Sequence, residues 1–122
     1  MTKKEISIQF LKYSASGQSR IAFELFVSQQ FKHHNPFFKA DPDSLIVAME
    51  ENAKLFPEKR IEILRGLEDE NLVSIHSYVK LFPTHVGIAL IHIFRFEENK
   101  IVELWDFGQA VPEDMINENG MF

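Results

Sequence analysis

The side chain of this sequence best suited to chemistry is an aspartate held between two aromatic residues. Trp105-Asp106-Phe107 lies near the end of His92–Gln109, a stretch that is typical of two β-strands joined by a tight turn. A carboxylate at the end of an apolar strand is costly unless it has a partner or a purpose. A partly desolvated carboxylate takes up protons more readily, so Asp106 is a candidate general base for an acidic C–H proton. The alternative is a strand-end aspartate that caps a turn or pairs with Arg95 or Lys100.

Histidines and an asparagine supply the other polar candidates. A neutral imidazole at His76 could donate a hydrogen bond to a substrate carbonyl or carry a proton. The alternative is a buried histidine that bonds to a backbone carbonyl or to Tyr78. His34 and Asn35 precede Pro36, so they either form a polar rim that orients a substrate or belong to a turn. No two histidines have the helical i, i+4 spacing, and HExxH and cysteine are absent, so we expect no metal site.

Charge and composition argue against several classes of protein. There are 13 Lys+Arg against 18 Asp+Glu, which gives a net charge of −5 without a basic stripe. Nucleic acid is therefore not the expected partner. The start MTKKEISIQF has no long apolar core after its lysines, and the longest apolar run, Gly87 to Ile91, is too short to span a membrane. We expect a cytoplasmic protein that has no membrane partner.

The length and the change of periodicity predict a single α+β domain, residues 1–122. Three helices come first: one that begins with a Thr2–Glu5 capping box, one at about Arg20–Gln30, and one at about Pro42–Phe56 after Asp41. Apolar residues then alternate, and four strands are expected at about 60–68, 72–82, 85–97 and 100–108. Helices followed by an antiparallel meander indicate an α+β layout rather than βαβ units.

Two-residue turns would set the register of this meander. Turns at Asp69-Glu70, Pro83-Thr84 and Glu98-Asn99 place one row on a common face: Ile63, His76, Ile91 and Asp106. On a flat sheet His76 and Asp106 would then lie about 10 Å apart, a gap that fits a small molecule. Tyr78 shares this face. A slip of one residue would move every side chain of a strand to the other face.

Apolar residues occupy both faces of the expected sheet. The face opposite Asp106 carries Val73, Ile75, Leu90, His92, Phe94 and Trp105, among others. Because the helices can cover only one face, we expect the other to meet a second subunit in a two-fold homodimer. Most of the 12 phenylalanines should form the core. Phe37 and Phe38, beside a turn, are the candidates for the mouth of a pocket.

Several segments follow one another in an order that is typical of a known family. After the three helices come His34-Asn35-Pro36, Val73-Ser74-Ile75-His76-Ser77, and Ile93-Phe94-Arg95 leading through Lys100-Ile101-Val102-Glu103 to Trp105-Asp106 and Gln109. Together, over roughly residues 5 to 110, they resemble the SnoaL-like polyketide cyclase branch of the nuclear-transport-factor-2-like superfamily. Two positions depart from the pattern: Leu104 stands where the family often has His, and His92 stands where it often has Asp.

The resemblance implies a fold and a reaction. The fold is a strongly curved, cone-shaped antiparallel sheet that three helices wrap around a deep pocket. The reaction is an intramolecular aldol condensation without cofactor or metal, in which Asp106 is the acid/base and His34, His76 and Gln109 lie near the substrate. Isomerases and non-catalytic proteins share the wider superfamily.

Three functions stay open at the level of sequence. The first is a cofactor-independent cyclase or isomerase-type enzyme that acts on a small apolar carbonyl compound. The second is a non-catalytic protein that binds a small hydrophobic molecule in the same pocket. The third is a structural dimer with a vestigial pocket. A fold alone does not choose among them.

Overall fold

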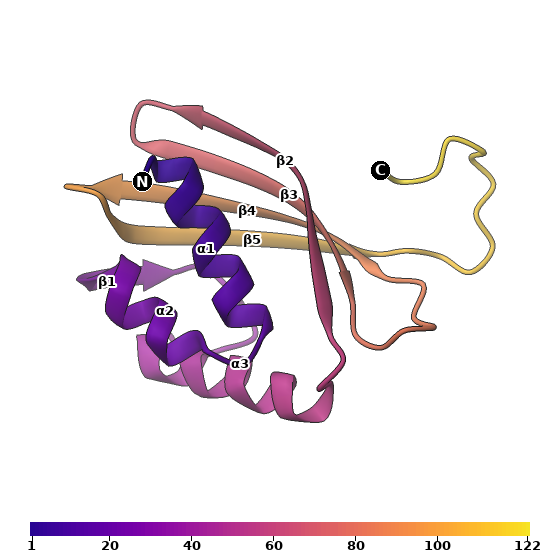
Figure 1. The fold of residues 1–122 in the computed structure, drawn as a ribbon, viewed down its shortest axis with the longest axis horizontal. Coiled ribbons are helices and arrows are strands. Elements are labelled where there is room, and N and C mark those ends of the chain that lie inside the picture. The colour runs from indigo at the N-terminus through magenta and orange to yellow at the C-terminus, as the bar shows by residue number, and fades with distance from the viewer.

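Three helices and a five-stranded sheet make up the computed structural model, which describes all residues from Met1 to Phe122 (Figure 1). The elements are α1 (Lys3–Ala15), α2 (Ser19–Phe26), β1 (Val27–His33), α3 (Pro42–Leu55), β2 (Arg60–Asp69), β3 (Leu72–Lys80), β4 (Ile88–Glu97) and β5 (Lys100–Ala110). The strand order is β1-β5-β4-β3-β2, and the sheet is open. The α+β fold expected from the sequence, with helices packed on a curved sheet, is confirmed.

Two helices begin at the caps that the sequence predicts. The Thr2 hydroxyl accepts a hydrogen bond from the Glu5 amide at 3.1 Å, and the Glu5 carboxylate accepts one from the Thr2 amide at 3.2 Å. The Asp41 carboxylate accepts a hydrogen bond from the Ser44 amide at 2.8 Å, ahead of α3. These side chains satisfy amides that have no partner inside their helices.

Strand β1 takes the place of the end of an expected helix. The helix predicted over Arg20–Gln30 stops at Phe26, and Val27–His33 pair with β5 in parallel. The sheet is therefore mixed rather than purely antiparallel. Pairing with β5 gives this backbone hydrogen-bond partners and buries Phe31 and His33. These tertiary contacts outweigh the modest helix preference of the glutamines.

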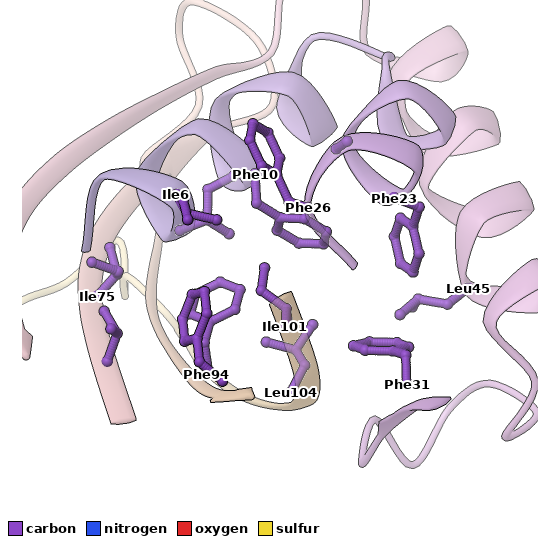
Figure 2. Packing of buried hydrophobic residues seen from close by; sticks show 14 of the residues in the cluster. Ile6, Phe10, Phe23, Phe26, Phe31, Leu45, Ile75, Phe94, Ile101 and Leu104 are labelled. Carbon is purple, nitrogen blue, oxygen red and sulfur yellow. The ribbon is translucent and has the colours of Figure 1, made fainter. Parts of the chain in front are cut away.

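The core lies between the helices and one face of the sheet, which we call the inner face (Figure 2). Phe10 of α1 is at its centre and is 1% exposed. Its ring centroid lies 5.4 Å from that of Phe23 in α2 and 5.6 Å from that of Phe94 in β4. Phe26 and Phe31 are buried in the same cluster, as expected for most of the phenylalanines.

The opposite face of the sheet, the outer face, has no helix on it (Figure 1). The chain after β5 swings away from the body, and its last residue, Phe122, returns to rings on this face, 6.0 Å from His76 and 4.5 Å from Tyr78 between centroids. No helix in the protein is long and apolar enough to cross a membrane.

Candidate functional site

A cavity of about 300 Å³ opens between α1, α3 and the inner face of the sheet. This volume is at the small end of the range for ligand pockets. Most of its lining is apolar and includes Phe10, Leu45, Met49, Ile61 and Leu90. The polar lining is sparse: Ser14, Asn35, Asn52, Lys59, His92 and Asp106. An apolar cavity with a few polar groups is the usual form of a small-molecule site.

Asp106 projects from β5 into this cavity and is held by a single side chain. The Asn35 side-chain amide donates to both carboxylate oxygens, at 3.0 Å and 3.3 Å. The amide is itself oriented, because its Oδ1 accepts a hydrogen bond from the backbone N–H of Phe37 at 3.0 Å. No Lys or Arg forms an ion pair with Asp106. The carboxylate therefore keeps accepting capacity for a ligand.

His33 fixes the loop that carries Asn35. Its ring Nε2 donates to the Lys39 carbonyl at 2.8 Å, and its Nδ1 accepts from the Asn35 backbone N–H at 3.1 Å. The imidazole is buried, and both hydrogen bonds are partly buried. His33 thus positions Asn35, which positions Asp106.

His92 of β4 lies directly opposite Asp106 in the sheet and also lines the cavity. Its Nδ1 is buried and has no hydrogen-bond partner. Burial lowers the pKa of His92 from 6.5 to about 4, although the nearby Asp106 charge acts in the opposite direction. The imidazole is therefore neutral near pH 7, with one N–H donor and one acceptor nitrogen.

Two β-bulges explain why His92, and not His76, faces Asp106. Val102 is an extra residue in β5: Glu97 pairs with Lys100 as expected, but Asp106 pairs with His92 instead of Ile91. A second bulge, at Leu64 in β2, and a turn at Glu70-Asn71 pair His76 with Arg65 instead of Ile63. The expected registers of these two hairpins are thus wrong. The β3–β4 register, with His76 opposite Ile91, is correct.

The shift places His76 and Tyr78 on the outer face. The Arg65 guanidinium donates to His76 Nδ1, and the His76 ring lies against Phe122. The Tyr78 hydroxyl donates to the Val86 carbonyl at 2.8 Å. Its ring covers Gly87, whose φ is +103° and where an added Cβ would lie 2.1 Å from the ring. Neither His76 nor Tyr78 lines the cavity.

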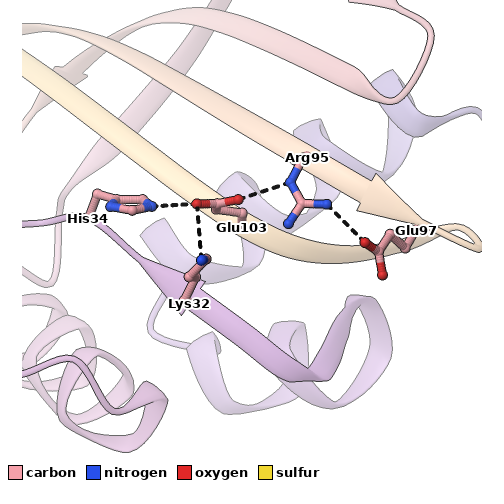
Figure 3. A network of polar contacts seen from close by, with 5 residues as sticks. All are labelled: Lys32, His34, Arg95, Glu97 and Glu103. Carbon is pink, nitrogen blue, oxygen red and sulfur yellow. Dashed lines mark hydrogen bonds and ion pairs between the residues drawn. The ribbon is translucent and has the colours of Figure 1, made fainter.

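His34 and Gln109 also lie outside the cavity. His34 stacks on Trp105 with ring centroids 5.0 Å apart, and its Nε2 donates to the Glu103 carboxylate at 2.6 Å. Figure 3 shows this contact continuing through Arg95 to Glu97, with Lys32 beside Glu103. The hydrogen bonds from His34 and Arg95 lower the pKa of Glu103. Gln109 is exposed near the end of β5.

Three of the seven predicted site residues therefore line one cavity: Asn35, Phe38 and Asp106. Phe38 lines the cavity and is 42% exposed, whereas Phe37 is 86% exposed and does not line it. Sequence reasoning missed His92, which it placed on the opposite face, and Lys59. His92 carried a usable signal, since it occupies a family position that is often Asp. Lys59 has no such signal in the sequence, because a lysine soon after a helix-ending proline is typical of an ordinary surface residue.

No group of three or more His, Asp or Glu side chains is arranged to hold a metal ion. The cavity instead offers one carboxylate, one amide pair, one imidazole and one ammonium group. Of these, the Asp106 carboxylate, the Asn35 amide and the His92 imidazole suit proton transfer and hydrogen bonding to a carbonyl compound.

Solved structures with this fold include proposed enzymes and proteins of unknown function. The proposed hydroxylase AclR from Streptomyces galilaeus is 19% identical, with a TM-score of 0.75 over 88% of this chain and 88% of that chain. A proposed SnoaL-like polyketide cyclase from Jannaschia sp. is 11% identical, with a TM-score of 0.71 over 88% and 85%. An NTF2-like protein of unknown function from Cytophaga hutchinsonii is 14% identical, with a TM-score of 0.69 over 89% and 91%.

These likenesses establish the nuclear-transport-factor-2-like fold, which the resemblance in sequence had implied. No family model matches the sequence, and no curated protein matches it either.

Proposed function

We propose that this nuclear-transport-factor-2-like domain binds a small apolar carbonyl compound and that Asp106 removes a proton from the carbon next to the carbonyl. The reaction would be an aldol-condensation (cyclase) or isomerase-type step that needs no cofactor. The observation that carries the proposal is the Asp106 carboxylate, open to an apolar cavity and held only by the Asn35 amide.

The residues present account for the proton and the electron pair of this step. Asp106 accepts the proton, and the C–H electron pair moves into the enolate, whose negative charge collects on oxygen. A neutral His92 can donate its N–H to that oxygen, and so can the Asn35 side-chain amide, which is already oriented. This assigns to His92 the role that the sequence suggested for His76 or His34. Returning the proton from Asp106 to another carbon completes an isomerisation. In an aldol reaction the enolate carbon instead bonds to a second carbonyl carbon, the C=O π electrons move to that oxygen, and the resulting alkoxide takes the proton from Asp106.

Deuterium exchange into 2-tetralone tests this proposal without knowledge of the natural substrate. The ketone is small, apolar and has acidic α-hydrogens, whose replacement in D₂O can be followed by NMR. The protein should accelerate the exchange, and Asp106→Asn should slow it about 100-fold or more, since a positioned general base contributes at least this much. Affinity for the ketone should stay within a few-fold of the original value.

The alternative function is a non-catalytic protein that holds the same type of ligand. It is favoured by Leu104, which packs in the core where family members often carry a histidine, so that one polar group of the usual site is missing. Binding of 2-tetralone without faster exchange would support this alternative and refute the catalytic proposal. Failure to bind would argue against both.

We also propose that a second copy of the chain covers the outer face. Large apolar side chains are exposed there, with Phe107 at 62% and Leu67 at 72%. Arg95 and Glu97, near the end of the central strand β4, carry both signs of charge, which suits a two-fold contact in which each copy offers the same surface.

A further inference from the structure

A lysine without a carboxylate partner lines the cavity and is the second charged group in its wall. Lys59 comes just before β2, and Lys59 and Asp106 are the only Lys, Arg, Asp or Glu side chains of the lining. None of the ion pairs in the protein includes Lys59. Its ammonium group donates to Asn52 Oδ1 at 2.5 Å, a neutral acceptor on α3.

The surroundings of Lys59 leave its charge uncompensated. An ammonium group can donate three hydrogen bonds, and the protein provides one acceptor. Removing a cation from water without a counter-charge is unfavourable. Burial accordingly lowers the pKa of Lys59. Lys54, near the end of α3, is exposed, so water solvates its ammonium group and no counter-charge is needed.

A second polar side chain of the lining, Ser14, has no hydrogen-bond partner in the protein. Ser14 is on α1, lines the same cavity and is 9% exposed, and its hydroxyl has no hydrogen bond. A buried hydroxyl normally finds a partner, commonly the backbone carbonyl one turn earlier in its helix. Ser14 of α1, Asn52 of α3 and Lys59 before β2 all line the cavity, and none of them is hydrogen-bonded to Asp106 or Asn35.

We propose that Lys59, with Ser14, forms an anion-binding subsite in the cavity, so that the ligand is an apolar carbonyl compound that also carries an acidic group such as a carboxylate. The acidic group would accept hydrogen bonds from the Lys59 ammonium and the Ser14 hydroxyl. The apolar body of the ligand would contact the aromatic and aliphatic lining, which leaves the carbonyl to the group around Asp106. This inference rests on the proposed function, since it names the class of compound that the same cavity takes.

A matched pair of probes tests the subsite by isothermal titration calorimetry at pH 7. The probes are 2-naphthoate and 2-naphthamide, which have nearly the same size and differ in charge. The protein should bind 2-naphthoate about tenfold more tightly, as expected for one charge-assisted contact. Lys59→Met, which keeps an unbranched side chain one atom shorter and removes the charge, should reduce this preference to about twofold or less while 2-naphthamide binds as before.

Lys54→Met is the matched control, because it removes the same charge from an exposed position near the end of α3. It should leave the tenfold preference intact. Equal affinities of the two probes for the original protein would overturn the proposal. So would a preference that survives in Lys59→Met, or one that is lost equally in Lys54→Met.

The outcome can be separated from that of the proposed function. Exchange into 2-tetralone, which has no acidic group, should be within a few-fold of the original rate in Lys59→Met. Normal exchange together with no acid preference would reject the subsite and leave the Asp106 chemistry standing. An acid preference that depends on Lys59, with no exchange in any variant, would reject the catalytic step and retain the subsite.

Discussion

Asp106 and His92 are neighbours across two strands, and each determines what the other can do. Asp106 is bonded to Asn35 and not to His92, whose Nδ1 stays without a partner. The pair therefore offers a negative carboxylate and a neutral imidazole to the same cavity. An enolisation needs this combination, because one group must accept a proton while another donates a hydrogen bond to the developing oxyanion.

The lowered pKa of His92 predicts how stability depends on pH. The unfolded chain binds a proton at His92 below about pH 6.5, whereas the folded protein binds one only below about pH 4. The unfolded state thus binds more protons within this window, so the free energy of unfolding falls as the pH drops from 6.5 to 4. The loss should reach at most about 3 kcal/mol.

Urea unfolding at pH 7.5, 5.5 and 4.5 measures this effect. In His92→Gln the loss of unfolding free energy that this side chain causes at low pH should disappear. His85→Gln, which changes a histidine in a hairpin loop, should still show the loss. An unchanged pH profile in His92→Gln would show that His92 is not buried as a neutral group.

Asp106 and Asn35 could be found from the sequence, whereas His92 and Lys59 could not be placed in the cavity from it. Asp106 stood out because a carboxylate interrupts an apolar strand, and Asn35 because it precedes a proline. His92 was assigned to the wrong side, since its placement depended on the register and not on its own identity. The role proposed for Lys59 depends on Ser14 and Asn52. The packing of α1 and α3 brings these two residues to the same cavity, and the sequence does not reveal this.

At the level of elements, four strands were predicted at nearly the right residues, but two of the three expected registers were wrong. The turn at Glu98-Asn99 was predicted correctly, and both residues have positive φ, 49° and 63°. The bulges at Leu64 and Val102 have no mark in the sequence, because an extra apolar residue continues the pattern on either face. β1 was missed for a related reason: its strand conformation comes from pairing with β5.

The loop between β1 and α3 connects element structure to the site, and His33 is the residue to test there. His33→Phe fills the same space beside Phe31 but removes the hydrogen bonds to Lys39 and Asn35. The free energy of unfolding should fall by about 1 kcal/mol, because a partly buried backbone carbonyl and N–H lose their partner. Exchange into 2-tetralone should also slow, because Asn35 no longer holds Asp106 in one orientation.

His85→Phe is the control for this loss. His85 accepts a hydrogen bond from the Leu81 backbone N–H in a different loop. The variant His85→Phe should lower the free energy of unfolding but leave the rate of exchange into 2-tetralone, per folded molecule, unchanged. If His33→Phe also leaves this rate unchanged, the loop does not position Asp106 for catalysis.

At the scale of the whole molecule, the two faces of the sheet have separate roles. The inner face and helices enclose the cavity, while the outer face exposes Phe107 and carries the ion-pair network around Glu103. An exposed apolar sheet face of this kind usually marks an interaction surface.

The proposed homodimer can be tested by light scattering after size exclusion. Phe107→Asp should give a monomer, because two-fold contact would bring the new charges of both copies into an apolar interface. Phe37→Asp, at an aromatic residue that is more exposed but lies outside the sheet, should leave the dimer intact. A monomer for the unmodified protein at micromolar concentration would contradict the prediction, as would an unchanged dimer in Phe107→Asp.

The bulge at Val102 has a consequence for how such proteins change over generations. Loss of the codon for Val102 would restore plain alternation, turn Asp106 to the outer face and bring an aromatic ring into the cavity, while the Trp-Asp pair stayed recognisable. Two homologues could then share the Trp-Asp signature and differ completely in chemistry. When sequences of this fold are compared, the parity of the residue count between the Glu98-Asn99 turn and the aspartate is thus a better guide to activity than the signature itself.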